Sequence, residues 1–364
     1  MVGAGAISDI YLKNMIHRFD SLSVKSICAG HIENAQKKAR EYGIQAVTME
    51  EMLDDPEIRL IVNLTPAHVH YSVIRAAVEH GKHVYTEKTL TDDLQKSAEL
   101  VELAHEKGVY LGSAQDTFLG SALQTARAAI DSGLLGEIHS FAVSANRNND
   151  ILLCIADFLR QPGGGIVCDY GVYYVTALVS LLGPVARVGS TVGYPYPTHK
   201  NIVPGTPLYG QIMDTPNESQ VNAVLQLENG VTGTFHIDAD SVTADQAYFT
   251  IYGTKGILFL TDPNQFGGEV RFLPNVMDPR RKNEPYVLPA ANGYSDNSRG
   301  IGPADLADTI LNGTPLRPSA EMAYHVHEVL DAMLKGGESG AFTDIRSSCE
   351  RPEPFRSEEF RSEN

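Results

Sequence analysis

The sequence predicts an α/β protein in which a doubly wound parallel sheet is followed by a second α/β domain with a large antiparallel sheet. Up to residue 119, short apolar strand patterns alternate with longer helical patterns, as in parallel sheets joined by crossover helices. Beyond residue 120, runs that alternate apolar and polar residues follow one another across short turns, which is typical of antiparallel strands. The chain of 364 residues is also long enough for two domains of ordinary size.

The first domain is expected to cover residues 1–119. Its helical patterns cover residues 9–19, 33–43, 69–81 and 92–108, and its strand patterns cover residues 22–28, 58–64, 82–86 and 109–114. Three of these helices end at glycines, which favour the left-handed conformation that closes a helix. Only Met1 and Val2 precede the first turn, whereas a central strand normally has about five residues. We therefore expect the chain or its relatives to begin a few residues earlier.

The second domain is expected to cover residues 120–350, and a polar tail to follow at 351–364. It begins with a helix at 121–136 and a strand at 137–147, and a glycine-rich turn then leads into an apolar helix that ends at Gly183. Strand patterns follow at residues 185–193, 220–228, 231–238, 247–252, 257–261 and 269–273. Closing helices are expected at residues 302–312 and 320–335. Alternation within the strands predicts an open, mostly antiparallel sheet with one covered face.

The composition and charge exclude several classes of protein. A formal net charge of −16 opposes binding to nucleic acid or to an anionic membrane, because both require clustered Lys and Arg. No apolar run reaches the roughly 18 residues of a membrane span, and no signal peptide is expected. The four cysteines lack the C-x2-C spacing of a zinc site, and no other cluster has metal-binding spacing. We expect a cytoplasmic protein with reduced thiols and no metal.

The first turn carries a glycine pattern, Gly3-x-Gly5-x-x-Ser8, that is similar to the fingerprint of dinucleotide-binding turns, with Ser8 in place of the third glycine. In such turns the first glycine makes the bend, and the second lets a pyrophosphate approach the N-terminus of the next helix. Glycine-rich turns are common, so the pattern alone leaves an ordinary turn open. The alternating strands and helices around it favour a cofactor contacted by Gly3, Gly5, Ala6 and Ile7.

The end of the second strand does not specify which dinucleotide binds. An Asp or Glu is expected there to bind the ribose 2′-hydroxyl, but the chain has Ala29, Gly30 and His31. The missing carboxylate removes a repulsion against the 2′-phosphate of NADP, so NAD and NADP both stay open, with NAD slightly preferred. His31 contacts the ribose or phosphate in one interpretation and is an exposed loop histidine in the other.

Polar residues follow several predicted strands at the points where they end. The stretch "HVYTEKTL" leaves an apolar strand and places Glu87 and Lys88 at its tip. This pattern fits either a solvated loop or a catalytic lysine at the carboxyl edge of a parallel sheet, where open α/β sheets bind ligands. Asn63 ends a neighbouring strand at the same edge. Arg147 and Asn148 end the first strand of the second domain and are, by position alone, candidates for contact with a polar substrate.

These pieces, taken in order, resemble the Gfo/Idh/MocA family of oxidoreductases along nearly the whole chain. The matching segments are "GAGAIS" (3–8), "NLTPAHVH" (63–70), "GKHVYTEKTL" (81–90), "DTFLG" (116–120), "GGGIVCDYGVYYVTALVSLLGPV" (163–185), "YGTKGILFLTDPNQFGG" (252–268), "RGIGPADLA" (299–307) and "SCERP" (348–352). The resemblance implies a Rossmann domain followed by an α/β domain with a large open, mostly antiparallel sheet. In the family that sheet commonly packs against its counterpart in another subunit, so a homodimer or homotetramer is expected.

The resemblance also implies catalytic positions. The family's strand-tip motif is Glu-Lys-Pro, whose lysine reaches the nicotinamide and the substrate hydroxyl; Glu87 and Lys88 match it, and Thr89 replaces the proline. The family's Asp-x-x-x-His, at the start of a helix, reads Asp169 to Tyr173 here, and some members carry tyrosine at that place. The residues alone leave a helix N-cap open for Asp169 and simple packing open for Tyr173.

The family's "TP…H" segment, which passes beside the dinucleotide, matches Thr65, Pro66 and His70. Asn63 and Glu87 lie next to matched positions and complete the expected cofactor contacts. A capped surface histidine is the alternative for His70. The expected substrate contacts are Lys88, Arg147, Asn148, Asp169 and Tyr173.

The function implied by the resemblance is an NAD(P)-dependent oxidoreductase that acts on a secondary hydroxyl of a sugar, glycoside or cyclic polyol. An ammonium beside that hydroxyl stabilises the negative charge that grows on the oxygen, which suits Lys88 to the task. Two alternatives stay open. Some relatives cleave a glycosidic bond through transient oxidation with a bound cofactor, and a few members sense dinucleotides without catalysis.

Overall fold

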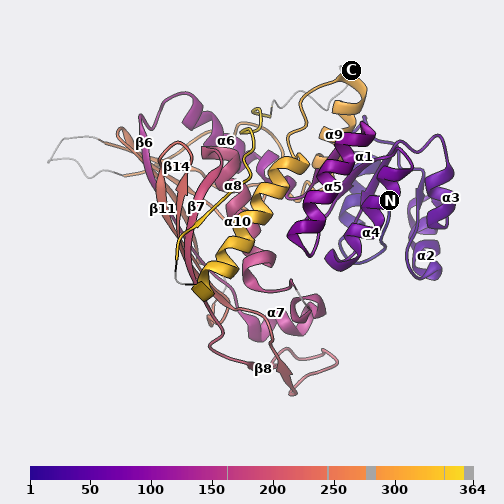
Figure 1. Cartoon of the computed structure of the whole chain (residues 1–364), viewed down its shortest axis with the longest axis horizontal. Helices are drawn as coiled ribbons and strands as arrows, with labels where there is room; N and C mark the ends of the chain where they lie inside the picture. The colour runs from indigo at the N-terminus through magenta and orange to yellow at the C-terminus, as the bar shows by residue number, and fades with distance from the viewer. Residues whose placement is uncertain (162, 244–245, 276–283, 340, 356–364) are drawn as a thin grey trace. The chain divides into compact units, whose positions relative to one another are not determined.

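The computed structural model describes residues 1–161, 163–243, 246–275, 284–339 and 341–355, and within it the chain divides into two compact units (Figure 1). Unit 1 consists of the segments Met1–Gly120, Gly293–Tyr324 and Pro352–Asn364, and unit 2 of the segments Ser121–Asn292 and His325–Arg351. The expected polar tail lies, from residue 356 on, outside the described residues.

Residues 293–324 belong to unit 1, which differs from the single boundary expected near residue 120. The reason is a set of long-range backbone contacts. The backbone N–H groups of Gly300 and Gly302 donate to the carboxylate of Asp116, and Ser319 pairs with Gly112. These contacts join segments that are far apart in the sequence, so no local sequence pattern predicts them.

Unit 1 contains a parallel sheet. Its strands are β1 (Ser26–Ile27), β2 (Gln45–Ala46), β3 (Leu60–Asn63), β4 (His83–Thr86) and β5 (Leu111–Ser113). Val2 bridges in parallel to Cys28 on one side and to Asn63 on the other, so the strand order is β2, β1, Val2, β3, β4, β5. The predicted parallel sheet is therefore confirmed. The strand expected at 22–28 is shorter in the structure, where β1 covers the two residues that pair with Gln45 and Ala46 of β2.

Helices cover both faces of this sheet, as a doubly wound fold requires. The helices of unit 1 are α1 (Ser8–His17), α2 (Ile32–Tyr42), α3 (Met49–Asp54), α4 (Ala67–Glu79), α5 (Leu94–Lys107) and α9 (Ile301–Asn312), with the 3-10 turn η1 (Asp116–Leu119) after β5. Ile61 and Val84 pack with α3, α4 and α5, whereas Val62 and Tyr85 pack with α1, α2 and α9. Successive strand residues thus enter opposite cores.

Unit 2 contains a nine-stranded sheet in the order β15-β14-β13-β12-β6-β11-β10-β7-β16. The strands are β6 (Ile138–Asn146), β7 (Val185–Gly193), β10 (Gln220–Leu227), β11 (Thr232–Asp238), β12 (Ala247–Gly253), β13 (Gly256–Leu260), β14 (Arg271–Pro274), β15 (Tyr286–Val287) and β16 (Thr343–Asp344). Every described neighbour pair in it is antiparallel except β11 and β6. The predicted open, mostly antiparallel sheet is confirmed.

One face of this sheet is covered by the helices α6 (Ser121–Asp131), α8 (Val172–Leu182) and α10 (Ala320–Ser339), which lie on the same side in Figure 1. Alternation decides which side chains meet the helices. On β11 and β12, Phe235 and Phe249 are buried against Tyr174 of α8, whereas Tyr248 is 62% exposed on the other face. The inner face therefore holds the core of unit 2.

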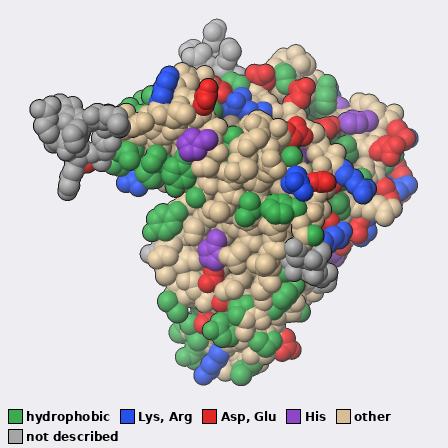
Figure 2. All heavy atoms as spheres, turned by 60° about the vertical axis from the view of Figure 1, so that its left-hand side comes forward, with side chains coloured by type: hydrophobic (Ala, Val, Ile, Leu, Met, Phe, Trp, Pro, Cys, Tyr) green, Lys and Arg blue, Asp and Glu red, His purple; other side chains and the backbone are tan. Residues whose placement is uncertain are grey.

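Several elements of unit 2 were not expected from the sequence. Besides the short elements η2 (Asp157–Arg160), β15 and β16, they are α7 (Asn149–Ile155), a hairpin of β8 (Thr198–Lys200) with β9 (Ile212–Asp214), and a π-helical turn, η3 (Val167–Gly171), before α8. Figure 2 shows hydrophobic side chains gathered at the lower end of the view, where β8 lies in Figure 1; the exposed ones in these segments include Ile155, Tyr196 and Ile212. Among the described residues, no helix combines the length and apolar character of a membrane span.

Candidate active site

The glycine turn of unit 1 has the shape that a dinucleotide requires. Gly3 has φ +104°, and a Cβ there would lie 2.7 Å from the carbonyl oxygen of Leu64, so only glycine fits. A Cβ on Gly5 would meet nothing within 4 Å, which leaves open space in front of the N-terminus of α1. The residues present therefore fit a pyrophosphate, which takes such a position. Ser8 is buried, and its hydroxyl donates to the carbonyl of Gly5 at 2.6 Å.

Ala6 and Ile7 complete the turn, and Ile7 is the residue that precedes the first turn of α1. His31 stands at the same position before α2 and is exposed, and its carbonyl accepts from the N–H of Asn34. The first turn of α2 contains Glu33, and no carboxylate ends β1. The geometry places His31 at the positive end of a helix but does not choose between its two interpretations.

Asn63 is fully buried at the end of β3, and its side chain holds two neighbouring segments together. Its Nδ2 donates to Oγ1 of Thr86 on β4 at 3.0 Å, and its Oδ1 accepts from the backbone N–H and the hydroxyl of Thr65 at 3.2 and 2.7 Å. The backbone of Glu87 donates to the carbonyl of Asn63 at 2.8 Å. The Asn63 amide therefore links Thr65 to Thr86 of β4.

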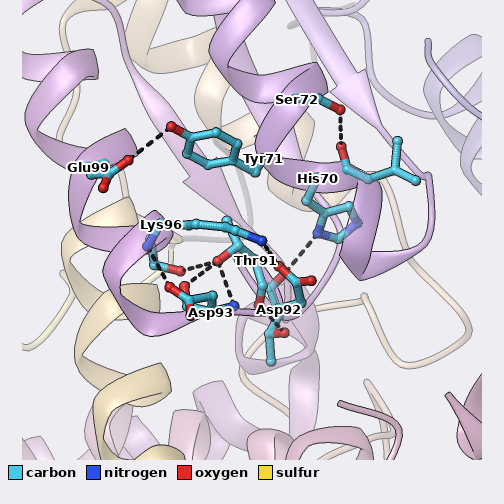
Figure 3. Close-up of polar contacts among 11 residues, drawn as sticks. His70, Tyr71, Ser72, Thr91, Asp92, Asp93, Lys96 and Glu99 are labelled. Carbon is cyan, nitrogen blue, oxygen red and sulfur yellow. Dashed lines mark hydrogen bonds and ion pairs between the residues drawn. The ribbon is translucent and has the colours of Figure 1, made fainter. Parts of the chain in front are cut away.

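His70 is buried with no exposed surface, which rules out the alternative of a surface histidine. Its Nδ1 lies 2.8 Å from the carbonyl oxygen of Thr89, and its Nε2 lies 2.7 Å from that of Thr65. Figure 3 shows the ring on α4. Pro66 precedes the first turn of α4 with φ −63°, a position that suits proline because its missing N–H is not needed there. Burial lowers the pKa of His70, while the two carbonyls and Glu87 act against that shift.

Lys88 lies at the tip of β4 in a turn whose backbone and side chains are hydrogen-bonded on both sides. The carboxylate of Glu87 accepts from the hydroxyl of Tyr11 at 2.8 Å and from the backbone N–H of Lys88 at 3.1 Å. Thr89 donates its hydroxyl to the carbonyl of Thr91 at 2.7 Å, and the Lys88–Thr89 peptide bond is cis. Lys88 is half-buried.

A buried acid behind this turn was not assigned a role from the sequence, although the "DTFLG" segment pointed to it. Asp116 is 1% exposed, and burial raises its pKa to about 6, while the charge of Arg299 and two backbone N–H groups act in the other direction. Burial, together with the charges of Glu87 and Asp116, also holds the pKa of Tyr11 well above its usual value. Tyr11 thus stays protonated and donates a hydrogen bond to Glu87 throughout the neutral range.

In unit 2, Asp169 lies inside the π-helical turn η3 and not at its start. The N-cap position belongs to Ile166, and the backbone N–H of Asp169 donates to the carbonyl of Gly165 at 2.8 Å. The N-cap alternative for Asp169 is therefore wrong. The turn is held by Glu218, whose Oε1 accepts from the N–H of Val167 at 3.0 Å and whose pKa is raised by burial.

Tyr173 and Tyr174 differ in how deeply their side chains are buried. Tyr174 is fully buried against Phe235 and Phe249, and its hydroxyl lies 3.3 Å from that of Tyr170. Tyr173 is half-buried in the first turn of α8. Because α-helical neighbours point about 100° apart, the two side chains face different surroundings, and packing accounts for Tyr174.

Arg147 and Asn148 point to different partners within unit 2. The guanidinium of Arg147 lies 4.6 Å from the centre of the Tyr170 ring, next to Asp169 in the sequence. Its Nε is buried and has no hydrogen-bond partner among the described residues. Asn148 donates its side-chain N–H to the backbone carbonyl of Val242 at 3.2 Å, so its amide has a partner within unit 2. Arg147 is therefore the stronger candidate for a substrate contact.

Comparison with known proteins agrees with this geometry. Residues 1–115 match a family model described as "Oxidoreductase family, NAD-binding Rossmann fold", and residues 123–259 match the "GFO/IDH/MocA C-terminal domain". A dTDP-3,4-didehydro-2,6-dideoxy-alpha-D-glucose 3-reductase from Streptomyces violaceoruber is 26% identical over 284 residues, which cover 75% of this chain and 80% of that protein.

Levoglucosan dehydrogenase from Pseudarthrobacter phenanthrenivorans is 22% identical over 350 residues, which cover 88% of this chain and 89% of that protein. A solved structure of a levoglucosan dehydrogenase in complex with NADH and L-sorbose has a TM-score of 0.81 at 19% identity, over 95% of this chain and 98% of that one. At that low identity, the likeness to the solved structure concerns the fold alone. The two matched family models, together with the Rossmann sheet and the large mixed sheet that follows it, show that this chain belongs to the Gfo/Idh/MocA family of NAD-binding oxidoreductases.

Proposed function

We propose that the protein is an NAD(P)-dependent dehydrogenase that acts on a secondary hydroxyl of a sugar, glycoside or cyclic polyol. The observation that carries the proposal is the Lys88 turn: a half-buried lysine at the carboxyl end of a central parallel strand, held between hydrogen-bonded segments in the same unit as the open Gly5 turn. The named relatives that act on sugars, and on scyllo-inositol, support the substrate class.

The residues of the chain have separate tasks in this proposal. A bound nicotinamide supplies the acceptor for a hydride. Lys88 places an ammonium beside the substrate hydroxyl, where it stabilises the negative charge on oxygen as the proton leaves. Asp169 orients a substrate hydroxyl, and Tyr173 shares in the proton transfer. Arg147, with its unpartnered Nε, adds a donor for a polar substituent of the substrate.

For the cofactor we propose NAD, with NADP as the alternative. The exposed His31 and the absence of a carboxylate at the end of β1 leave room for either. The relatives include scyllo-inositol dehydrogenases named for NAD(+) and for NADP(+). Calorimetric titration with NADH and NADPH separates the two, because the preferred dinucleotide will bind more tightly at equal salt.

The test of the proposed reaction is turnover of NAD+ and NADP+ with a panel of monosaccharides, glycosides, anhydrosugars and inositols. We expect reduction of the dinucleotide with at least one of these compounds. Consumption of a glycoside with release of its aglycone and no net NADH would instead support the oxidation-elimination alternative. Tight dinucleotide binding without turnover of any compound would support the sensing alternative.

We also propose that the protein forms a homo-oligomer, a dimer or tetramer, through the outer face of the sheet in unit 2. Tyr248 of β12 and Val224 of β10 are 62% and 44% exposed on that face. Apolar and aromatic side chains exposed on an open sheet favour association. A monomeric mass in light scattering at micromolar concentration would contradict this proposal.

A further inference from the structure

The imidazole of His70 lies between two backbone carbonyl oxygens and contacts both. Figure 3 shows the ring and one of these contacts. The ring is fully buried, and the oxygens of Thr89 and Thr65 lie 2.8 and 2.7 Å from its two nitrogens. Here both partners belong to the main chain, so the ring determines where two backbone segments lie relative to each other.

The chemistry of the contact fixes which atoms donate and which accept. Carbonyl oxygens only accept hydrogen bonds, and a neutral imidazole has one N–H, whereas an imidazolium has two. Burial lowers the pKa of His70, and the two carbonyls together with the charge of Glu87 favour the protonated form. In either form at least one carbonyl receives a hydrogen bond from the ring.

The two segments that the ring joins are the ones expected to surround the reacting atoms. Thr89 directly follows Lys88, and Thr65 opens the segment after β3. The turn is anchored on its far side as well, because the hydroxyl of Thr91 lies 2.8 Å from that of Ser97 on α5. His70 comes from α4, so the Lys88 turn is held between two helices of the same unit (Figure 3).

We propose that His70 is a positioning residue for Lys88, acting through the carbonyl of Thr89, and does not itself contact the cofactor. This inference rests on the proposed function only in taking Lys88 as the group that handles the substrate proton. Removal of the ring nitrogens frees the backbone of Thr89, and Lys88 then no longer points in one direction.

The first experiment compares His70→Phe with His80→Phe. Phenylalanine keeps a ring in the buried space but donates no hydrogen bond. His80 is a matched control, since it follows α4, is exposed, and also pairs a ring nitrogen with a carbonyl, that of Ala76. We expect His70→Phe to lower kcat by roughly 10- to 100-fold, because small misplacements of a catalytic group have costs of this size. KM and the Kd for NADH should change by less than about threefold, a split that general loss of structure does not give.

A conservative variant gives a second reading. His70→Gln retains an amide donor that can reach one carbonyl, so its kcat should lie between those of the wild type and His70→Phe. Wild-type kcat in both variants would overturn the proposal. So would a loss confined to NADH affinity, because His70 would then be a cofactor contact.

A third measurement does not depend on turnover. Amide hydrogen exchange of residues 87–90 should speed up in His70→Phe, while exchange in α2 stays as in the wild type. Unchanged exchange at residues 87–90 would overturn the positioning role even in an active enzyme. If the wild type itself shows no turnover, the proposed function fails, yet faster exchange would still establish that His70 holds the turn. Should His70→Phe not fold, exchange and kcat of His70→Gln decide the question in the same way.

Discussion

The Lys88 turn of unit 1 and the Asp169 segment of unit 2 are held in position by different means. Around Lys88, contacts from other elements hold the turn. They come from the His70 ring of α4, from the backbone carbonyl of Asn63 on β3, which accepts from the N–H of Glu87, and from Tyr11 of α1, which donates to the Glu87 carboxylate. Around Asp169, the backbone is held by its own π-helical hydrogen bonds and by the single carboxylate of Glu218.

This difference shows that a candidate catalytic residue can be held in place by long-range or by local contacts. The Lys88 turn depends on residues spread over much of unit 1, so it forms only when the whole sheet is assembled. The Asp169 segment depends on a glycine-rich turn that fits closely. A Cβ on Gly165 would lie 2.0 Å from the carboxylate oxygens of Glu218. The carboxylate that holds the segment therefore leaves room only for a small residue at this position.

The two regions also respond to pH in opposite directions. Burial lowers the pKa of His70, so its contribution to stability is present above the unfolded value of 6.5 and is lost as pH falls through the folded pKa. Burial raises the pKa of Glu218, so its contribution is present below 4.5 and is lost as pH rises through the folded pKa. The stability linked to His70 therefore falls with acid, and the stability linked to Glu218 falls with base.

The largest expected effect is that of Lys88→Met, which keeps most of the volume and removes the charge. Loss of a general acid-base lowers kcat by about 10²–10⁴-fold, or roughly 3–5 kcal/mol of barrier. The Kd for NADH should change much less, because the pyrophosphate turn is untouched. Steady-state kinetics with Lys107→Met, an exposed lysine at the end of α5, provide the control. Turnover above a tenth of the wild-type value would remove Lys88 from the proton transfer.

Gly5→Val tests the other half of the site in unit 1. The added side chain fills the open space before α1, so NADH binding should fall below detection while the melting temperature stays near that of the wild type. Gly3→Ala is the matched contrast. It should destabilise the fold instead, because of its φ of +104° and the nearby carbonyl of Leu64. Retained NADH affinity in folded Gly5→Val, measured by calorimetry, would refute the fingerprint.

A smaller effect is expected from the buried acid behind the Lys88 turn. Asp116→Asn removes the group whose pKa burial raises from 3.8 to about 6. The wild type should therefore lose stability relative to the variant as pH rises through that window, by about 1–3 kcal/mol. Urea unfolding at both ends of the window measures the difference. Glu218→Gln should show the same sign in unit 2. Parallel pH curves for variant and wild type would mean that Asp116 is ionised in both states.

The smallest effect concerns the two tyrosines of α8. Tyr173→Phe should lower kcat by at least about 10-fold and shift the alkaline limb of the pH–rate profile, whereas Tyr174→Phe should cost about 0.5–1.5 kcal/mol of stability and leave kcat intact. If Tyr173 and Lys88 serve one proton, the losses in the double variant will not add. Fully additive losses, or wild-type kcat in Tyr173→Phe, would make Tyr173 a packing residue.

Local patterns were sufficient to predict much of this protein. The parallel sheet of unit 1, the open sheet of unit 2 and the strand tip at Glu87 and Lys88 follow from periodicity and from glycine positions, both of which act over a few residues. The capping box of α3, Thr48 with Glu51, was also visible in the sequence, and the short helix there was missed.

Only the tertiary structure decided what surrounds the candidate residues. No pattern near His70 reveals that its nitrogens face the carbonyls of Thr65 and Thr89, because those partners are brought close by the register of β3 and β4. The return of residues 293–324 to unit 1 depends likewise on Asp116, far away in the chain. The sequence by itself determined the elements and the residue types at their ends, since both depend on local backbone preferences. The aim of Lys88 and the burial of His70 were decided by packing, since both depend on contacts between distant segments.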